Sequence, residues 1–278
     1  MKVDRSRATG WRYLATVLSG LLLIPALALL NATPASAAIQ TVTSGDFTFN
    51  FDDADTSAGA TIVGYSGPGG ALHLPTTYTD DGTTYSVVGI GDAVFENDGI
   101  TSLILPSNLK RIGAHAFRGN SISAVTFPAG IEIIRSNAFA DNDITSVTLP
   151  AGFDFISNSY QAFMDNDITS VSLPDSITML PEGIFRGNQI STLVVPDGVT
   201  EIENNAFLNN QISNLTLSSA VESIGYGAFW GNSLTSITLP DSLHTIGANA
   251  FYSNDLTEVT IPASVPTIGS EAFEETPL

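Results

Sequence analysis

The sequence contains no cysteine and few cationic side chains. Its 278 residues include nine Lys and Arg against 28 Asp and Glu, a formal net charge of −19 at pH 7. Without cysteine no disulfide can staple the fold, so a hydrophobic core must supply the stability. The acidic excess disfavours nucleic acid and anionic membrane surfaces, so we expect neither as a partner.

Long hydrophobic runs are confined to the start of the chain. A basic start precedes an apolar run at 14–30, and small residues follow it. This order is typical of a secretory signal peptide over 1–37 and predicts cleavage between Ala37 and Ala38. An uncleaved membrane anchor is the alternative. We expect 38–278 to be secreted, extracellular or on the cell surface, with no membrane insertion after cleavage.

The residue types that carry most chemistry are also scarce. The three histidines, His73, His115 and His244, do not have the spacing of a metal-binding pair. The sequence has no cysteine nucleophile and no phosphate-binding glycine loop. The aspartates within 52–55 do not fit the calcium loop of an EF-hand. We therefore expect no enzymatic activity, no metal and no cofactor.

What the sequence does contain is a repeat. The segment NDITSVTLP at 142–150 returns as NDITSVSLP at 166–174. Phenylalanine recurs with seven spacings of 22 residues and one of 24, at Phe95, Phe117, Phe139, Phe163, Phe185, Phe207, Phe229, Phe251 and Phe273. The two extra residues lie within 156–163. Such self-similarity at a fixed period predicts a solenoid, in which stacked repeats share one continuous core.

Each repeat alternates apolar and polar residues before a proline. In SVTLP, Val147 and Leu149 are expected to point inward and Ser146 and Thr148 outward, which is the pattern of a short strand. Stacked repeats then form a parallel ladder with a step of about 4.8 Å. The xxIG segments, which come later in each repeat, predict a second and shorter ladder of strands. Tight turns or single helical turns would connect the strands, with no large helices.

Seven of these nine phenylalanines are followed three residues later by an asparagine, and Asp98 and Thr276 stand at the two ends of the column. An inward Asn at a turn can pair with backbone groups that a loop would leave unsatisfied. We therefore interpret the column as a structural ladder rather than as ligand contacts. Its members are Asn120, Asn142, Asn166, Asn188, Asn210, Asn232 and Asn254.

The arrangement I-G-x-x-A-F-x-x-N-x-I-T-x-V-T-L-P resembles the BspA-like class of leucine-rich repeats over about 90–278. Asn stands where that class usually has Cys in the turn after Phe. The resemblance implies a leucine-rich-repeat solenoid. It also implies a secreted or surface-displayed bacterial protein of adhesin type, with an extracellular protein or glycan as partner.

The remaining segments complete the predicted organisation. Residues 38–59 are expected to form an N-terminal cap, in which Phe47, Phe49 and Phe51 alternate with polar residues on an edge strand. A degenerate first repeat with an enlarged loop would occupy 60–89. Tandem repeats of 22 residues would follow over 90–278, with the last one incomplete.

Two outward surfaces could bind a partner. The outward strand positions present sixteen side chains, of which eleven are Ser or Thr, and we call this surface the hydroxyl face. Such a regular array of hydroxyl groups makes ice binding a remote alternative. The column directly after each Phe varies most, and Arg186, Leu208, Trp230 and Tyr252 occupy it in consecutive repeats. We call these four residues the ridge. Alternatively, their side chains merely cover neighbouring repeats.

These patterns favour a monomeric interaction module whose ridge contacts an extracellular protein or glycan. The alternative is a structural spacer or envelope component without a specific ligand. An exposed and contiguous pair of Trp230 and Tyr252 would favour the first function, whereas a buried pair would favour the second.

Overall fold

The computed structural model describes residues 39–278, which lie in one compact unit, Ala37–Leu278. The predicted signal peptide and its cleavage between Ala37 and Ala38 lie outside the described residues. Over 39–278 the chain forms short strands and one 3-10 helix, and no helix is long and apolar enough to cross a membrane.

The N-terminal part contains an antiparallel hairpin followed by the first repeats. Its elements are β1 (Ile39–Ser44), β2 (Phe47–Asp52), the 3-10 helix η1 (Thr56–Ala58), β3 (Ala60–Tyr65), β4 (Gly70–His73), β5 (Thr77–Asp80) and β6 (Thr83–Ile90).

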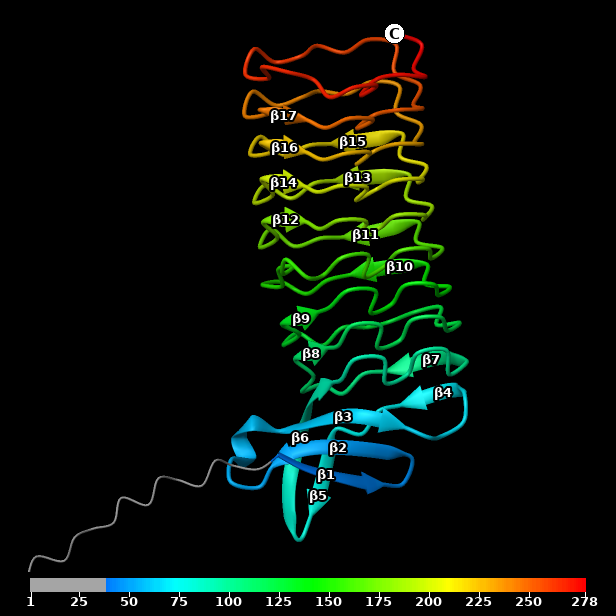
Figure 1. Cartoon of the computed structure of the whole chain (residues 1–278), viewed down its shortest axis with the longest axis vertical. Helices are drawn as coiled ribbons and strands as arrows, with labels where there is room; N and C mark the ends of the chain where they lie inside the picture. Colours follow the sequence, from blue (N-terminus) through cyan, green and yellow to red (C-terminus); the bar gives the residue numbers. More distant parts are fainter. Residues whose placement is uncertain (1–38) are drawn as a thin grey trace, which may run out of the picture. The chain divides into compact units, whose positions relative to one another are not determined.

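The repeats that follow carry one or two very short strands each, on two sides of the stack (Figure 1). One side holds β8 (Arg111–Ile112), β9 (Ile133–Ile134), β12 (Met179–Leu180), β14 (Glu201–Ile202), β16 (Ser223–Ile224) and β17 (Thr245–Ile246). The other holds β7 (Ile100–Ile104), β10 (Ser146–Thr148), β11 (Ser170–Ser172), β13 (Thr192–Val194) and β15 (Asn214–Thr216). All pairs between repeats are parallel, so the predicted solenoid is confirmed.

The two sides differ in continuity. The two-residue strands belong to long ladders: β12, β14, β16 and β17 pair in succession, and β8 and β9 continue a run that begins with β3 and β6. The strands of the other side form only the separate pairs β4–β7, β10–β11 and β13–β15. We expected one regular ladder there, and the structure shows it interrupted. The proline that follows most of these strands has no N–H to donate, so each strand ends there.

Phenylalanine rings form the centre of the core. From Phe95 to Phe251 the rings of this column are fully buried, and those of successive repeats stack with centroids 5.1–5.8 Å apart. The backbone beside them bonds from repeat to repeat, as where Phe117 N donates to Ala138 O at 2.8 Å. Stacked aromatic rings add an attraction beyond the area that they bury.

The segments around each Phe are tight turns and not helical turns. Two residues per repeat take a left-handed backbone there, for example Asn137 with φ 56° and Asp141 with φ 57°. Glycine, asparagine and aspartate adopt this conformation at least cost. This explains why Gly119, Gly187 and Gly231 directly precede the asparagines of the ladder.

The hairpin β1–β2 extends a sheet of the solenoid. Strand β2 lies between β1 and β3, so Phe47, Phe49 and Phe51 are not on an edge strand as we expected. The edge is β1, whose side chains are nearly all exposed. Strand β2 is internal because it pairs with β1 on one edge and with β3 on the other. Its buried Phe49 and Phe51 pack on Tyr78 and Tyr85 of the β5–β6 hairpin, with ring centroids 4.5 and 4.6 Å apart. That hairpin occupies the segment that we expected to be an enlarged loop.

The repeat with two extra residues keeps its place through one hydroxyl group. Ser159 is fully buried and its Oγ donates to Ile134 O at 2.7 Å. In other repeats a backbone N–H makes the equivalent bond, as where Gly247 N donates to Ile224 O at 2.8 Å. The exposed residues Ser157 and Asn158 therefore form the actual insertion.

Candidate functional site

The asparagine ladder faces the interior and joins adjacent repeats. Asn188 shows the common geometry. Its Nδ2 donates to Phe163 O of the preceding repeat at 2.9 Å and to Phe185 O of its own repeat at 3.0 Å. Its Oδ1 accepts the N–H of Ile168 at 3.0 Å. Both ends of the amide are thus used inside the protein, in a site where an unpaired group would cost stability.

All seven asparagines of the ladder are buried and make these bonds. Their exposed fractions lie between 4% and 8%. Each Oδ1 accepts an N–H from the preceding repeat, and each Nδ2 donates to phenylalanine carbonyls, at Asn120, Asn142, Asn166, Asn188, Asn210, Asn232 and Asn254. The column therefore offers no free amide to a ligand.

The ridge lies on the outside, and its aromatic members are in contact. Arg186, Leu208, Trp230 and Tyr252 are all half-buried. The rings of Trp230 and Tyr252 meet edge to face with centroids 5.0 Å apart. The exposed Tyr226 lies edge-on to Trp230 at 6.4 Å. We call Tyr226, Trp230 and Tyr252 the aromatic cluster.

Tyr226 was missed in the sequence because it stands four residues before Trp230, outside the variable column. The sequence did carry a signal for Tyr226, because IGYGAF has a bulky aromatic residue where other repeats have alanine, as in IGAHAF and IGANAF. The ridge itself is less uniform than its column suggests. Within 39–278, Arg186 and Leu208 make no ring contact or side-chain hydrogen bond with the aromatic pair.

The surroundings of the ridge are acidic. Tyr252 is hydrogen-bonded to Glu275, and this bond together with burial and the nearby carboxylates raises the pKa of Tyr252. Burial and the like charge of Asp141 raise the pKa of Asp165, whereas the charge of Arg186 lowers it. Arg186 is thus the cation that partly balances this part of the surface.

The same column is unsuitable for binding in the earlier repeats. Arg118 is paired within the chain, with its Nε 2.9 Å from Asp141 Oδ2 and its Nη1 3.9 Å from Glu96 Oε1. Ala140 is fully buried. The column therefore presents aromatic side chains only near the C-terminal end of the stack.

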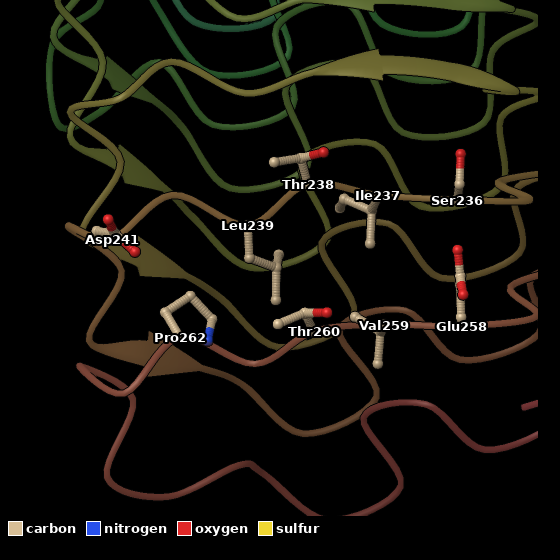
Figure 2. A pocket seen from close by; sticks show the side chains of 9 residues that line it. All are labelled: Ser236, Ile237, Thr238, Leu239, Asp241, Glu258, Val259, Thr260 and Pro262. Carbon is tan, nitrogen blue, oxygen red and sulfur yellow. The ribbon is translucent and has the colours of Figure 1, made fainter.

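The hydroxyl face opens into shallow cavities where its strands are unpaired. Figure 2 shows one of about 420 Å³, with Ser236 and Thr238 on one segment and Glu258 and Thr260 on the next. Apolar side chains such as Leu239 line it as well. Such openings interrupt the hydroxyl lattice that the sequence suggested. The cavity in Figure 2 offers small polar groups and carboxylates but no aromatic or cationic anchor.

Metal chemistry finds no support in the described part of the chain. Within residues 39–278 no group of three or more His, Cys, Asp and Glu side chains could hold a metal ion. His73 is exposed on β4, as its position between two inward leucines predicts.

Comparison with known proteins is consistent with this architecture. A profile of the BspA type leucine rich repeat region matches residues 88–161 and 157–278. A leucine-rich repeat protein from Bacteroides ovatus ATCC 8483 has a similar structure, with 22% identity and a TM-score of 0.62 over 84% of this chain and 68% of the other. The pneumococcal vaccine antigen PcpA is 19% identical with a TM-score of 0.51 over 84% and 78%. No curated protein matches the chain.

Proposed function

The chain belongs to the BspA-type leucine-rich repeat proteins, and we propose that it is a secreted or cell-surface module that binds an extracellular protein or glycan. The proposal gives the protein a binding role, adhesin-like and without catalysis.

The aromatic cluster is the observation that supports this role. Tyr226, Trp230 and Tyr252 form a contiguous set on the outside of two neighbouring repeats. The core does not need them, because Phe229 and Phe251 fill it beside them and are fully buried. Trp and Tyr are enriched among the residues that carry binding energy at interfaces. Half-buried rings lose little freedom when a partner covers them.

The rest of the ridge adds chemical variety to this cluster. Leu208 supplies an aliphatic surface and Arg186 a planar cation on the two preceding repeats. The hydroxyl face offers mainly Ser and Thr, and isolated surface carboxylates give weak contacts that salt screens. We therefore place the partner contact at the ridge and extend it to Tyr226.

The test is capture by the chain from residue 38 to 278, which contains every residue that the structure describes. Immobilised protein would be offered purified extracellular matrix proteins and a glycan array. A double variant, Trp230→Ala with Tyr252→Ala, is expected to lose the captured partner while its melting temperature stays near the parent value.

A second variant serves as the control. It carries Lys in place of Thr148, Ser172 and Thr216, which are exposed on the hydroxyl face. Capture should survive these changes. Capture that survives the aromatic variant but is lost in the lysine variant would move the site to the hydroxyl face. A parent chain that captures nothing would favour the structural spacer.

A further inference from the structure

A second surface lies on the outer side of the continuous ladder β12–β14–β16–β17. It is a shallow groove of about 460 Å³ lined by Tyr160, Glu182, Glu201, Glu203, Asn204 and Tyr226, which we call the acidic groove. Its two tyrosines, Tyr160 and Tyr226, are exposed, at 40% and 43%. Exposed aromatic side chains on a sheet face are a feature of docking surfaces.

The repeat places these residues together. Tyr160, Glu182, Asn204 and Tyr226 lie 22 residues apart and hold the same position in four consecutive repeats. Glycine forms part of the floor: a Cβ on Gly225 would lie 2.7 Å from the backbone of Glu203. The groove is therefore open because its floor is backbone, and its rim is set by side chains that the core does not use.

The charge of this half of the stack is almost entirely of one sign. Between residues 136 and 278 the sequence has one Arg against seventeen Asp and Glu, whereas the other four Lys and Arg that follow the signal segment lie at 110–135. The groove contributes three carboxylates on two neighbouring repeats. Of the five Lys and Arg residues that follow the signal segment, only Arg186 lies near these two repeats. It is on the outside of the repeat that carries Glu182.

Glu203 is the most constrained of these carboxylates. It is half-buried, and its Oε2 accepts the N–H of Glu182 at 2.8 Å. Burial raises the pKa of Glu203, and the charges of Glu201 and Glu182 raise it further, against the lowering effect of that hydrogen bond. A positive charge placed in the groove would relieve this repulsion.

We propose that the acidic groove binds a lysine or arginine side chain from an extended segment of a partner protein. The proposal deepens the proposed function and rests on it, because it names the chemistry of the partner. Carboxylates attract the cation, and a tyrosine ring within reach adds a cation–π contact that is worth more when the site is partly desolvated. The field of the acidic half also speeds the encounter with a cationic partner.

Two other occupants are less favoured by the same observations. A second copy of the chain would bring an equal acidic excess, so net repulsion opposes it. A neutral sugar could stack on the tyrosines, but it would leave three carboxylates without a counter-charge. Both become outcomes of the test.

The experiment uses a capped decapeptide of alternating Gly and Lys, titrated into the 38–278 chain by calorimetry at low ionic strength. The matched probe is the same peptide with every lysine acetylated, which keeps its length and removes its charge. We expect the lysine peptide to bind and the acetylated peptide not to bind. Affinity should fall as salt is added.

Variants then locate the contact. Glu201→Gln with Glu203→Gln should weaken the lysine peptide at least about tenfold. Gln at 203 can still accept the N–H of Glu182, so the fold should survive. The control, Asp255→Asn with Glu258→Gln, removes the same charge from exposed sites outside the groove and should change affinity by less than about twofold. Tyr226→Leu should weaken binding, and Tyr226→Phe should restore it.

Several results would overturn the proposal. Equal losses in the two charge variants would show attraction by net charge alone. Binding of the acetylated peptide or of a neutral oligosaccharide at the groove, without the lysine peptide, would show another ligand. Concentration-dependent dimers lost in the groove variant would identify a second copy. If the lysine peptide does not bind but the ridge still captures a partner, the proposed function stands and only the acidic groove is wrong. If the lysine peptide binds but the ridge captures no partner, the proposed function is overturned.

Discussion

The buried and the outward columns of the same repeats follow opposite rules. Phe185 and Asn188 lie inside, and their counterparts recur with the same chemistry throughout the stack. Their direct neighbours Arg186 and Gln189 lie toward solvent and differ from repeat to repeat. The comparison shows that a one-residue step separates positions that hold the stack together from positions that can carry recognition.

This separation has a structural cause. Each repeat is joined to the next by backbone hydrogen bonds, by a stacked Phe and by one Asn amide, and none of these requires an outward side chain. The same backbone can therefore carry a paired Arg118 in an early repeat and the pair of Trp230 and Tyr252 in late ones. The predictions below compare inward and outward neighbours, from the largest expected effect to the smallest.

Replacing Phe185 by Ala should lower the free energy of unfolding by about 3–5 kcal/mol, since it opens a cavity between two stacked rings. Its outward neighbour Arg186→Ala should stay within about 0.5 kcal/mol of the parent. Urea unfolding of the 38–278 chain measures both. Similar losses at the two positions would refute the stacked core.

Asn188→Ala should cost about 1–3 kcal/mol, because it leaves the buried N–H of Ile168 without its acceptor and removes the bonds to Phe163 O and Phe185 O. Gln189→Ala should change stability by less than about 0.5 kcal/mol, since the exposed side chain of Gln189 donates to the exposed Asp167 and the substitution keeps its backbone bond to Ile168 O. The same unfolding assay compares them. A silent Asn188 variant would mean that the ladder does not join the repeats.

Deleting Ser157 and Asn158 should be tolerated with a change of about 1 kcal/mol or less, because shortening a surface loop alters little chain entropy. The deletion restores the 22-residue period and leaves Ser159 in place. Ser159→Ala in the chain that keeps all its residues should cost more, since the bond from the buried hydroxyl to Ile134 O is then lost. Thermal melts of the deletion and of this substitution would separate the two effects, and identical melting temperatures would argue against a role for Ser159.

Glu203→Gln should give a small gain in stability at neutral pH. The pKa of Glu203 is raised in the folded chain, so the carboxyl ionises more readily in the unfolded chain. The free energy of unfolding therefore falls as pH rises from the ordinary Glu range to the raised pKa. The gain should therefore vanish below pH about 4, where the carboxyl is protonated in both states. Melts across pH would test this, and a gain that persists in acid would contradict it.

The sequence predicted the inward columns well and the outward surface only in part. Phe and Asn recur at a fixed period because each must meet its copy in the next repeat, so their roles follow from spacing alone. Strand pairing did not follow, since the alternation in SVTLP is the same whether or not neighbouring strands bond. The internal position of β2 depends on its pairing with β1 and β3, and its packing on Tyr78 and Tyr85 is a contact that no local pattern indicates.

The acidic groove was missed for a related reason. Tyr160 and Tyr226 each stand three residues before a core Phe, so the 22-residue spacing places them in one column. The spacing does not say that this column faces solvent beside Glu201 and Glu203, which the structure shows. Outward residues can differ freely, so their grouping becomes visible only in three dimensions.

The central claim is that outward columns near the C-terminal end form an accessible acidic and aromatic surface. Trp230 is the one tryptophan of the 38–278 chain, since the sequence has two and the other is Trp11. The most direct measurement is therefore quenching of its fluorescence by caesium, iodide and acrylamide. We predict substantial quenching by acrylamide, and stronger quenching by cationic caesium than by iodide after each is scaled to its effect on the unfolded chain. Emission that resists all three quenchers, or that iodide quenches more strongly, would contradict the account.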